Sequence, residues 1–444
     1  MRRRSGWRWI TSGGLWLALS GCAQVPLTHP PAPSVVPPLV QRGRVEAQIE
    51  TLPSAPTDVP TSATDPFPPA QYRALTAADV RRLACTHAPG ASLYRREAAA
   101  PHLRHHRPTV VSPAANLRQL ALQCTAREIQ NRAVGSALET YYRLAEAEGK
   151  TDLLDESIAQ LEIAVRETRD MLQQKLKPPV DVEVWSRQLH QAQGDRLKAQ
   201  QAIEELNSQL RRMLGNTTLS ERDRIWNPEA YHVNDEPIDL EAAVALALSQ
   251  RAELILWRSA IQTLSPQTIG VIEEVLQSSH PLIGQKAGGP LGKSLQALAG
   301  SRQHGRKQIE LRRQQLTEWL SQREAAIAEE VRQAVTSMRY HGRVVAIAWQ
   351  RERSHFQAVQ DGRNRQQQGL TSFAELTQLN LEWLRARADV LQATLAWYIA
   401  RVQVWQAQGL LADAEPMSCD TTTGPRYSGP PHFRTTSTVH CRWK

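Results

Sequence analysis

The sequence predicts an all-α fold, made of two long antiparallel helical hairpins that are related by internal duplication. The first observation is the composition, which is dominated by Ala, Leu, Gln, Glu and Arg, with only 5% aromatic residues. Such a composition is typical of long helices and coiled coils. The second is that apolar residues recur at spacings of three and four along two stretches of roughly sixty residues. The third is that each stretch is followed by a short break and a second, shorter stretch with the same periodicity.

The first hairpin is expected between residues 116 and 214. Its ascending helix covers about 116–176 and ends before Pro178-Pro179, because proline lacks a backbone N–H and disfavours helix in the residue before it. The return helix is expected over 181–214. Gly215 follows it and is a typical helix terminator.

The second hairpin is expected between residues 303 and 409. Its ascending helix covers about 303–368 and breaks at Gly369. Thr371 or Ser372 is a candidate N-cap for the return helix, which ends at Gly409. At 1.5 Å per residue each ascending helix is about 90 Å long, so it needs its return helix and further subunits to cover its apolar stripe.

Each half opens with a short amphipathic helix, at Leu75–Cys85 and again at Leu240–Leu248, with an acidic residue in its first turns. We interpret this repetition as internal duplication. The predicted organisation is a signal peptide (1–21), a Pro-rich tether (22–71), a first helical repeat (72–239), a second helical repeat (240–411) and a flexible C-terminal tail (412–444).

The N-terminus has the features of a bacterial export signal: a basic start, a short apolar run and small residues. Leu19-Ser20-Gly21-Cys22 resembles a lipobox, which implies cleavage before Cys22 and lipidation of that cysteine. The alternative is an ordinary signal peptide with a chance cysteine. Ala23, where an aspartate would favour retention at the inner membrane, indicates sorting to the outer membrane. Without the four arginines of the signal, the net charge falls from +9 to +5, which gives no argument for nucleic-acid binding.

Four further cysteines remain, and an exported compartment permits disulfides between them. Their even number suggests the pairs Cys85–Cys124 and Cys419–Cys441, although four cysteines allow three pairings. The alternative is four free thiols.

Several other patterns are weak. Residues 288–294 look like a phosphate-binding loop, but the required first glycine is replaced by Ala287 and no strand precedes them. His102, His105 and His106 lack a Cys, Asp or Glu at ligand spacing and are interpreted as solvated loop residues. No nucleophile with a base and no paired carboxylates are apparent. The sequence therefore predicts no enzymatic activity, metal or cofactor.

The final hairpin carries a family resemblance. Gln368-Gly369-Leu370-Thr371-Ser372-Phe373, Leu379-Asn380-Leu381 and Arg385-Ala386-Arg387-Ala388-Asp389-Val390-Leu391 closely resemble the last helical hairpin of TolC-like outer-membrane efflux proteins. Ala400-Arg401-Val402 and Gln406-Ala407-Gln408-Gly409-Leu410-Leu411 are similar to that family's ending. The resemblance covers most of residues 75–411.

The resemblance implies a homotrimer that forms a periplasmic tunnel of helices, of which each protomer supplies a part of the wall. It also implies that the hairpin tips contact a periplasmic adaptor protein, which links to an inner-membrane pump. The adaptor-contact tip carried over to this sequence is Gly369, Leu370, Thr371 and Ser372. The other tip, residues 176–180, departs from the family in having Pro178-Pro179 where a glycine-containing turn is usual.

In this family a β-barrel hairpin follows each short opening helix. Here the first such slot, about residues 98–115, is short and charged, and the second, about 265–302, begins with helical spacing and becomes rich in Gly and Pro. Neither slot has the alternation that a spanning strand requires. We therefore expect the β-barrel strands to be weak or absent, and attachment to depend on lipid at Cys22.

The leading functional hypothesis is an outer-membrane-anchored efflux channel component of a tripartite export system, with its body in the periplasm. The alternative is a non-transport envelope scaffold or spacer lipoprotein derived from the same fold. A periplasmic adaptor is less consistent with the sequence, because adaptors have one helical hairpin flanked by β-rich domains.

Overall fold

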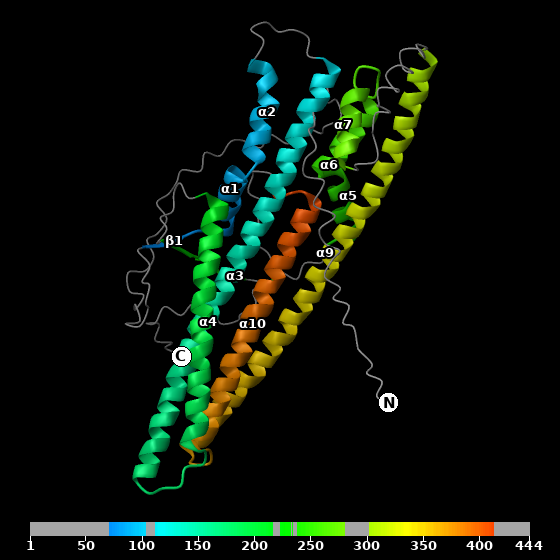
Figure 1. Ribbon diagram of the computed structural model, residues 1–444. Coiled ribbons are helices and arrows are strands. Elements are labelled where there is room, and N and C mark those ends of the chain that lie inside the picture. The colour runs from blue at the N-terminus through cyan, green and yellow to red at the C-terminus, as the bar shows by residue number, and fades with distance from the viewer. Residues whose placement is uncertain are drawn as a thin grey trace, which may run out of the picture. The chain divides into compact units, whose positions relative to one another are not determined.

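The computed structural model describes residues 71–103, 112–215, 223–231, 233, 238–279 and 302–412. Within these ranges the chain is helical apart from two short strands (Figure 1). The elements in order are β1 (Gln71–Ala74), α1 (Ala77–His87), α2 (Ala91–Leu103), α3 (Pro113–Gln173), α4 (Val182–Leu214), β2 (Asp223–Trp226), α5 (Leu240–Gln250), α6 (Ala252–Gln262), α7 (Ile269–Ser279), α9 (Arg302–Gln367) and α10 (Phe373–Gln408).

The four long helices confirm the two predicted hairpins. The ascending helices α3 and α9 have 61 and 66 residues, and their return helices are α4 and α10. Ser372 caps α10 by accepting a hydrogen bond from the backbone N–H of Glu375 at 3.2 Å. Gly409 ends α10 in the left-handed conformation, with φ of 76°. Both caps are the ones that the sequence predicts.

The short opening helices begin with side-chain caps. The hydroxyl of Thr76 accepts a hydrogen bond from the N–H of Asp79, and the Asp79 carboxylate accepts one from the N–H of Thr76, which forms a capping box at the start of α1. Asp239 caps α5 by accepting from the N–H of Glu241 at 3.0 Å. Two short helices, a long ascending helix and a return helix thus occur twice in the same order, with α7 added in the second half.

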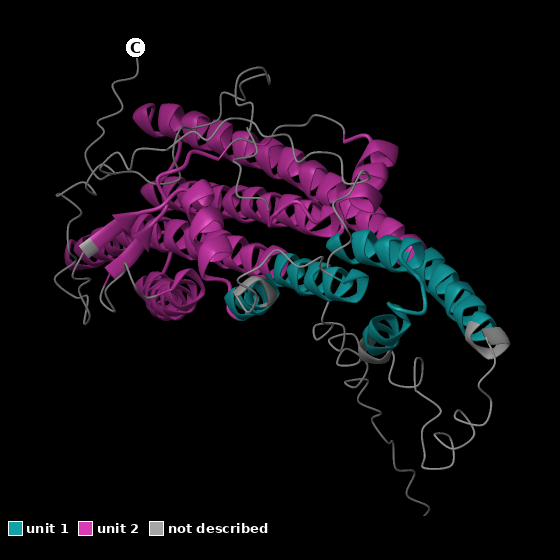
Figure 2. Cartoon of the chain, turned by 90° about the horizontal axis from the view of Figure 1, so that it is seen from above, with its two compact units in different colours: residues 1–40, 90–129, 252–323 teal, residues 41–89, 130–251, 324–444 magenta. Residues whose placement is uncertain are grey.

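Two compact units divide the chain (Figure 2). The first takes the described parts of residues 90–129 and 252–323, and the second takes those of 71–89, 130–251 and 324–412. Both units contain segments of each repeat, since α3 and α9 run through both. The division of the body at residue 239 into two repeats remains a prediction.

The first unit has a core formed by the start of α3, helices α6 and α7, and the start of α9. Its fully buried apolar side chains include Leu117, Ile272 and Leu316. Beside this core, the buried carboxylate of Glu273 accepts hydrogen bonds from the Arg312 guanidinium at 3.1 and 3.2 Å and from the Gln308 amide at 2.9 Å. An ion pair therefore joins α7 to α9 inside this unit.

The second unit has a core formed by α1, α3, α4 and α10. Tyr141 of α3 is fully buried and donates its hydroxyl hydrogen to the Leu75 carbonyl at 2.8 Å, which ties the opening segment to the long helix. Gly149 permits the close approach of α3 and α10, because a Cβ at this position would lie 2.6 Å from a methyl carbon of Leu391.

The strands β1 and β2 pair in parallel, with Gln71 opposite Asp223 and Ala74 opposite Trp226. Arg73 and Asp223 form an ion pair at 3.3 Å, and the N–H of Ile225 donates to the Asn207 side chain of α4 at 2.8 Å. The sequence does not predict this pair, since four-residue strands are too short to show a period-two pattern. The structure also places Gln71 in β1, whereas the sequence analysis places it at the end of the tether.

The predicted Cys85–Cys124 disulfide is wrong for this structure, in which both residues are buried thiols. The reason is packing: Cys85 belongs to the core of the second unit and Cys124 to that of the first. The Cys85 sulfur also accepts a hydrogen bond from the Gln130 amide at 3.2 Å. Burial raises the pKa of Cys124 to about 12, which keeps this thiol protonated. Cys22, Cys419 and Cys441 lie outside the described residues.

Parts of both slots, and the whole loop at 288–294, fall outside the described residues. Residues 104–111, with His105 and His106, and residues 280–301, with the loop at 288–294, are among those not described. The described part of the second slot is α7, which confirms the helical spacing seen there. In the described part of the chain, no helix combines the length and apolar character needed to cross a membrane.

Candidate docking surface at the hairpin tips

The second hairpin turns at Gly369, where φ is +71°. The N–H of Gly369 donates to the Gln366 carbonyl at 2.9 Å, and the N–H of Leu370 donates to the Arg365 carbonyl at 2.8 Å. These two bonds form a Schellman motif, in which a residue in the left-handed conformation closes the end of a helix. The motif leaves the Leu370 side chain 71% exposed. Of the other predicted tip residues, Thr371 is buried and Ser372 is exposed.

The first hairpin turns with the same hydrogen bonds. Lys175 has φ of 59°, the N–H of Lys175 donates to the Leu172 carbonyl at 3.0 Å, and that of Leu176 donates to the Met171 carbonyl at 2.9 Å. Helix α3 therefore ends before Pro178-Pro179, and the prolines follow the turn. The two turns have similar sequences, Gln-Gln-Lys-Leu at 173–176 and Gln-Gln-Gly-Leu at 367–370. A lysine in the left-handed conformation is uncommon, so the sequence alone does not indicate a turn at Lys175.

The starts of α4 and α10 bring the two tips together, at the same end of the second unit (Figure 1). Between them is an open groove of about 380 Å³. Its lining from α4 and the preceding loop includes Val180, Val184 and Trp185, and its lining from α10 includes Ala374 and Leu379. Trp185 is 3% exposed and packs in a small apolar core with residues of α3 and α10. The groove thus has a mainly apolar lining, to which Gln188, Ser372, Glu375 and Gln378 add polar groups.

Large apolar side chains are exposed at both turns: Leu172 and Leu176 on the first, and Leu370 and Phe373 on the second. Scattered exposed apolar residues are ordinary, but a group of them beside a groove is typical of a protein-interaction site. We name the groove and the two turns, residues 171–185 and 362–379, the tip surface. The sequence predicted the second turn as a contact site, and the structure adds the first turn and the groove.

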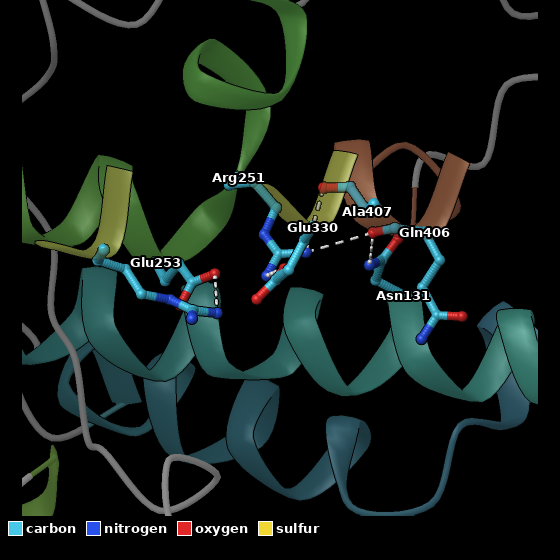
Figure 3. A network of polar contacts seen from close by, with 7 residues as sticks. Asn131, Arg251, Glu253, Glu330, Gln406 and Ala407 are labelled. Atoms are coloured by element: carbon cyan, nitrogen blue, oxygen red, sulfur yellow. Dashed lines mark hydrogen bonds and ion pairs between the residues drawn. The ribbon is translucent and has the colours of Figure 1, made fainter. Parts of the chain in front are cut away.

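The opposite end of α10 is held by a polar network in the second unit (Figure 3). Arg251, which directly follows α5 and is 5% exposed, donates to the carbonyls of Gln406 at 3.4 Å and Ala407 at 3.2 Å and pairs with Glu330 at 3.2 Å. Asn131 of α3 also donates to the Gln406 carbonyl, at 2.8 Å. A cation at a helix C-terminus compensates the helix dipole. This network therefore positions the return helix whose other end forms the tip surface.

One titratable group in the body departs strongly from its ordinary behaviour. Burial, and then the neighbouring Asp155 and Glu156, raise the pKa of Asp152 on α3 to about 7, while Arg387 of α10 opposes this increase. Arg387 pairs with Glu156 at 2.7 Å and so joins α10 to α3. Among the described residues no group of His, Cys, Asp and Glu has an arrangement suited to a metal ion. We assign these carboxylates to the packing of the hairpins.

Comparison with known proteins identifies the fold. No protein-family model and no curated protein sequence matches the chain. Solved structures do match. The CmeC outer membrane channel of Campylobacter jejuni has a TM-score of 0.53 and 11% sequence identity, covering 75% of this chain and 85% of CmeC. CusC, described for its transmembrane channel formation, has a TM-score of 0.51 and 15% identity, covering 76% and 96%. A membrane protein from Pseudomonas aeruginosa has a TM-score of 0.53 and 9% identity, covering 75% and 90%.

The chain therefore has the helical-hairpin fold that is found in outer-membrane channels. More particularly, it is the TolC-like fold that the sequence resemblance implies. At these levels of sequence identity the likeness establishes the fold, and function has to be argued from the surface described above.

Proposed function

We propose that this protein is the channel component of a tripartite export system, anchored in the bacterial outer membrane by lipid on Cys22. In this proposal three copies form a helical tunnel in the periplasm. The tip surface binds a periplasmic adaptor protein, which connects the tunnel to an inner-membrane pump. The observation that carries the proposal is the meeting of both hairpin turns at one end of the second unit, with exposed apolar side chains on both turns and a mainly apolar groove between the return helices.

The proposed assembly is supported by an apolar face on α9. Tyr340 and Ile347 are 62% and 56% exposed. They are seven residues apart and so lie on the same face of the helix. Apolar side chains that repeat along one face of a long helix are normally covered by another helix. A ring of identical subunits is the simplest assembly that covers such a face in every protomer.

Purified full-length protein is expected to form a trimer, because a ring of identical hairpins covers the exposed apolar side chains of α9 in every protomer. Native mass spectrometry would give the number of subunits. The control is the same preparation after heat denaturation, which should give monomers. A protein that remains monomeric at micromolar concentration would contradict the channel and favour the envelope scaffold.

Replacement of Gly369 by Val is expected to abolish crosslinking to the adaptor while the helical circular dichroism signal is retained. Nothing lies within 4 Å of a Cβ built at Gly369, so the effect comes from φ of +71°, which costs a β-branched residue roughly 1–3 kcal/mol and reshapes the turn. The measurement is photocrosslinking from the exposed position 368 in cells.

Gly194→Val is the matched control, since a Cβ at Gly194 also meets nothing within 4 Å and its φ is not in the left-handed region. It lies in the interior of α4, away from the turn, and should leave crosslinking intact. Unchanged crosslinking in the Gly369 variant would remove this turn from the contact site.

A further inference from the structure

We infer that the partner bound by the tip surface is acidic as well as apolar, and that four basic side chains of the tip surface select it. This inference rests on the proposed contact with an adaptor protein and adds the chemistry of the partner. Lys175 and Lys177 lie on the first turn, and Arg363 and Arg365 on the second. All four are exposed, and residues 171–180 and 362–374 contain no acidic residue.

None of these four cations forms an ion pair with any described residue. Some arginines of the hairpin body are paired, since Arg351 pairs with Asp389 at 3.3 Å and Arg387 pairs with Glu156 at 2.7 Å. The four cations of the turns are available to a second molecule.

Acidic residues enter the tip surface only with the first turns of the return helices, as Asp181, Glu183 and Glu375. The N-terminus of a helix carries a partial positive charge, so carboxylates in these turns are partly compensated by the helix itself. Residues 171–180 and 362–374 carry the four cations, so a partner that contacts these segments meets positive charge.

The groove and the charges define two parts of a partner surface. An apolar side chain fits the floor formed by Val184, Trp185 and Leu379, and carboxylates around it face the lysines and arginines. Exposed ion pairs contribute little affinity each. Complementary charge instead accelerates association and excludes partners of the wrong sign, and this effect weakens with salt. The predicted signature is therefore an association rate that depends on salt and on the sign of the partner's charge.

The experiment uses two disulfide-closed helical-hairpin peptides as probes. Both carry leucine at the tip, which is flanked by glutamates in one probe and by lysines in the other. Association with the full-length protein is followed at low and moderate ionic strength. We expect the acidic probe to associate at least about tenfold faster than the basic probe at low salt, and the difference to shrink as salt is added. The double variant Lys177→Glu/Arg365→Glu should associate faster with the basic probe than with the acidic probe.

Arg353→Glu/Arg385→Glu is the matched control, because it makes the same change of charge at exposed positions within α9 and α10, outside the tip surface. It should leave the preference intact. Equal binding of both probes, binding of neither, or the same change in the control variant overturns the inference. The inference is also overturned if the protein binds vesicles that contain phosphatidylglycerol and does not bind the acidic hairpin probe. The Gly369→Val crosslinking result then shows separately whether the proposed adaptor contact survives.

Discussion

Replacement of Glu273 by Gln is expected to lower the free energy of unfolding of the first unit by about 3–5 kcal/mol. Glu273 is 3% exposed and Arg312 is 8% exposed, and their side chains are joined at 3.1 Å. Removal of the carboxylate charge leaves the Arg312 guanidinium buried without a counter-ion. The cost is large because the interior solvates an isolated charge poorly.

The neighbouring residue supplies the control. Glu274 pairs with Arg118 at 2.9 Å, but both side chains are about half exposed, at 46% and 52%. Glu274→Gln should therefore cost less than about 1 kcal/mol. The double variant Glu273→Leu/Arg312→Met should recover most of the lost stability, since apolar residues of similar volume can replace a buried pair.

Hydrogen exchange of the α7 backbone is the appropriate measurement, because a protein with two compact units need not unfold in a single step. We expect α7 to lose protection in Glu273→Gln and to keep it in Glu274→Gln. Equal protection in the two single variants would show that the 273–312 pair does not hold α7 against α9.

Replacement of Cys22 by Ser is expected to abolish outer-membrane attachment almost completely. Cys22 lies outside the described residues, and the prediction rests on the lipobox-like sequence that ends at this position. Serine lacks the sulfur atom to which a lipid would be attached. Acyl chains contribute about 0.8 kcal/mol per buried CH₂ group, so their loss removes many kilocalories per mole of membrane affinity.

Membrane fractionation and mass spectrometry of the mature N-terminus would test this prediction. The wild-type protein should begin at an acylated Cys22, and Cys22→Ser should remain as the uncut precursor. Cys419→Ser/Cys441→Ser is the control with two cysteines replaced elsewhere, and it should be anchored normally. A wild-type N-terminus that is unmodified, or that begins at another residue, would support the ordinary signal peptide.

The candidate site was only partly predictable. The turn at Gly369 was predicted because a glycine between two periodic stretches is a local signal. The turn at Lys175 was misplaced, because Pro178-Pro179 offered a stronger local signal than a lysine in the left-handed region. The groove could not be predicted, since Trp185 and Leu379 are far apart in the sequence and share no motif.

The sequence by itself determined the four long helices of this protein, the short helix that opens each half and their order, whereas α2 and α6 were found only in the structure. Helical periodicity, N-caps such as Ser372 and terminators such as Gly409 depend on neighbours within one or two turns, so they can be interpreted locally. The tertiary structure alone decided the pairing of β1 with β2, the burial of Glu273 against Arg312, the placement of Cys85 and Cys124 in separate cores, and the meeting of the two tips. These features depend on which distant surfaces pack together to remove apolar area from water, and no short stretch of sequence specifies that choice.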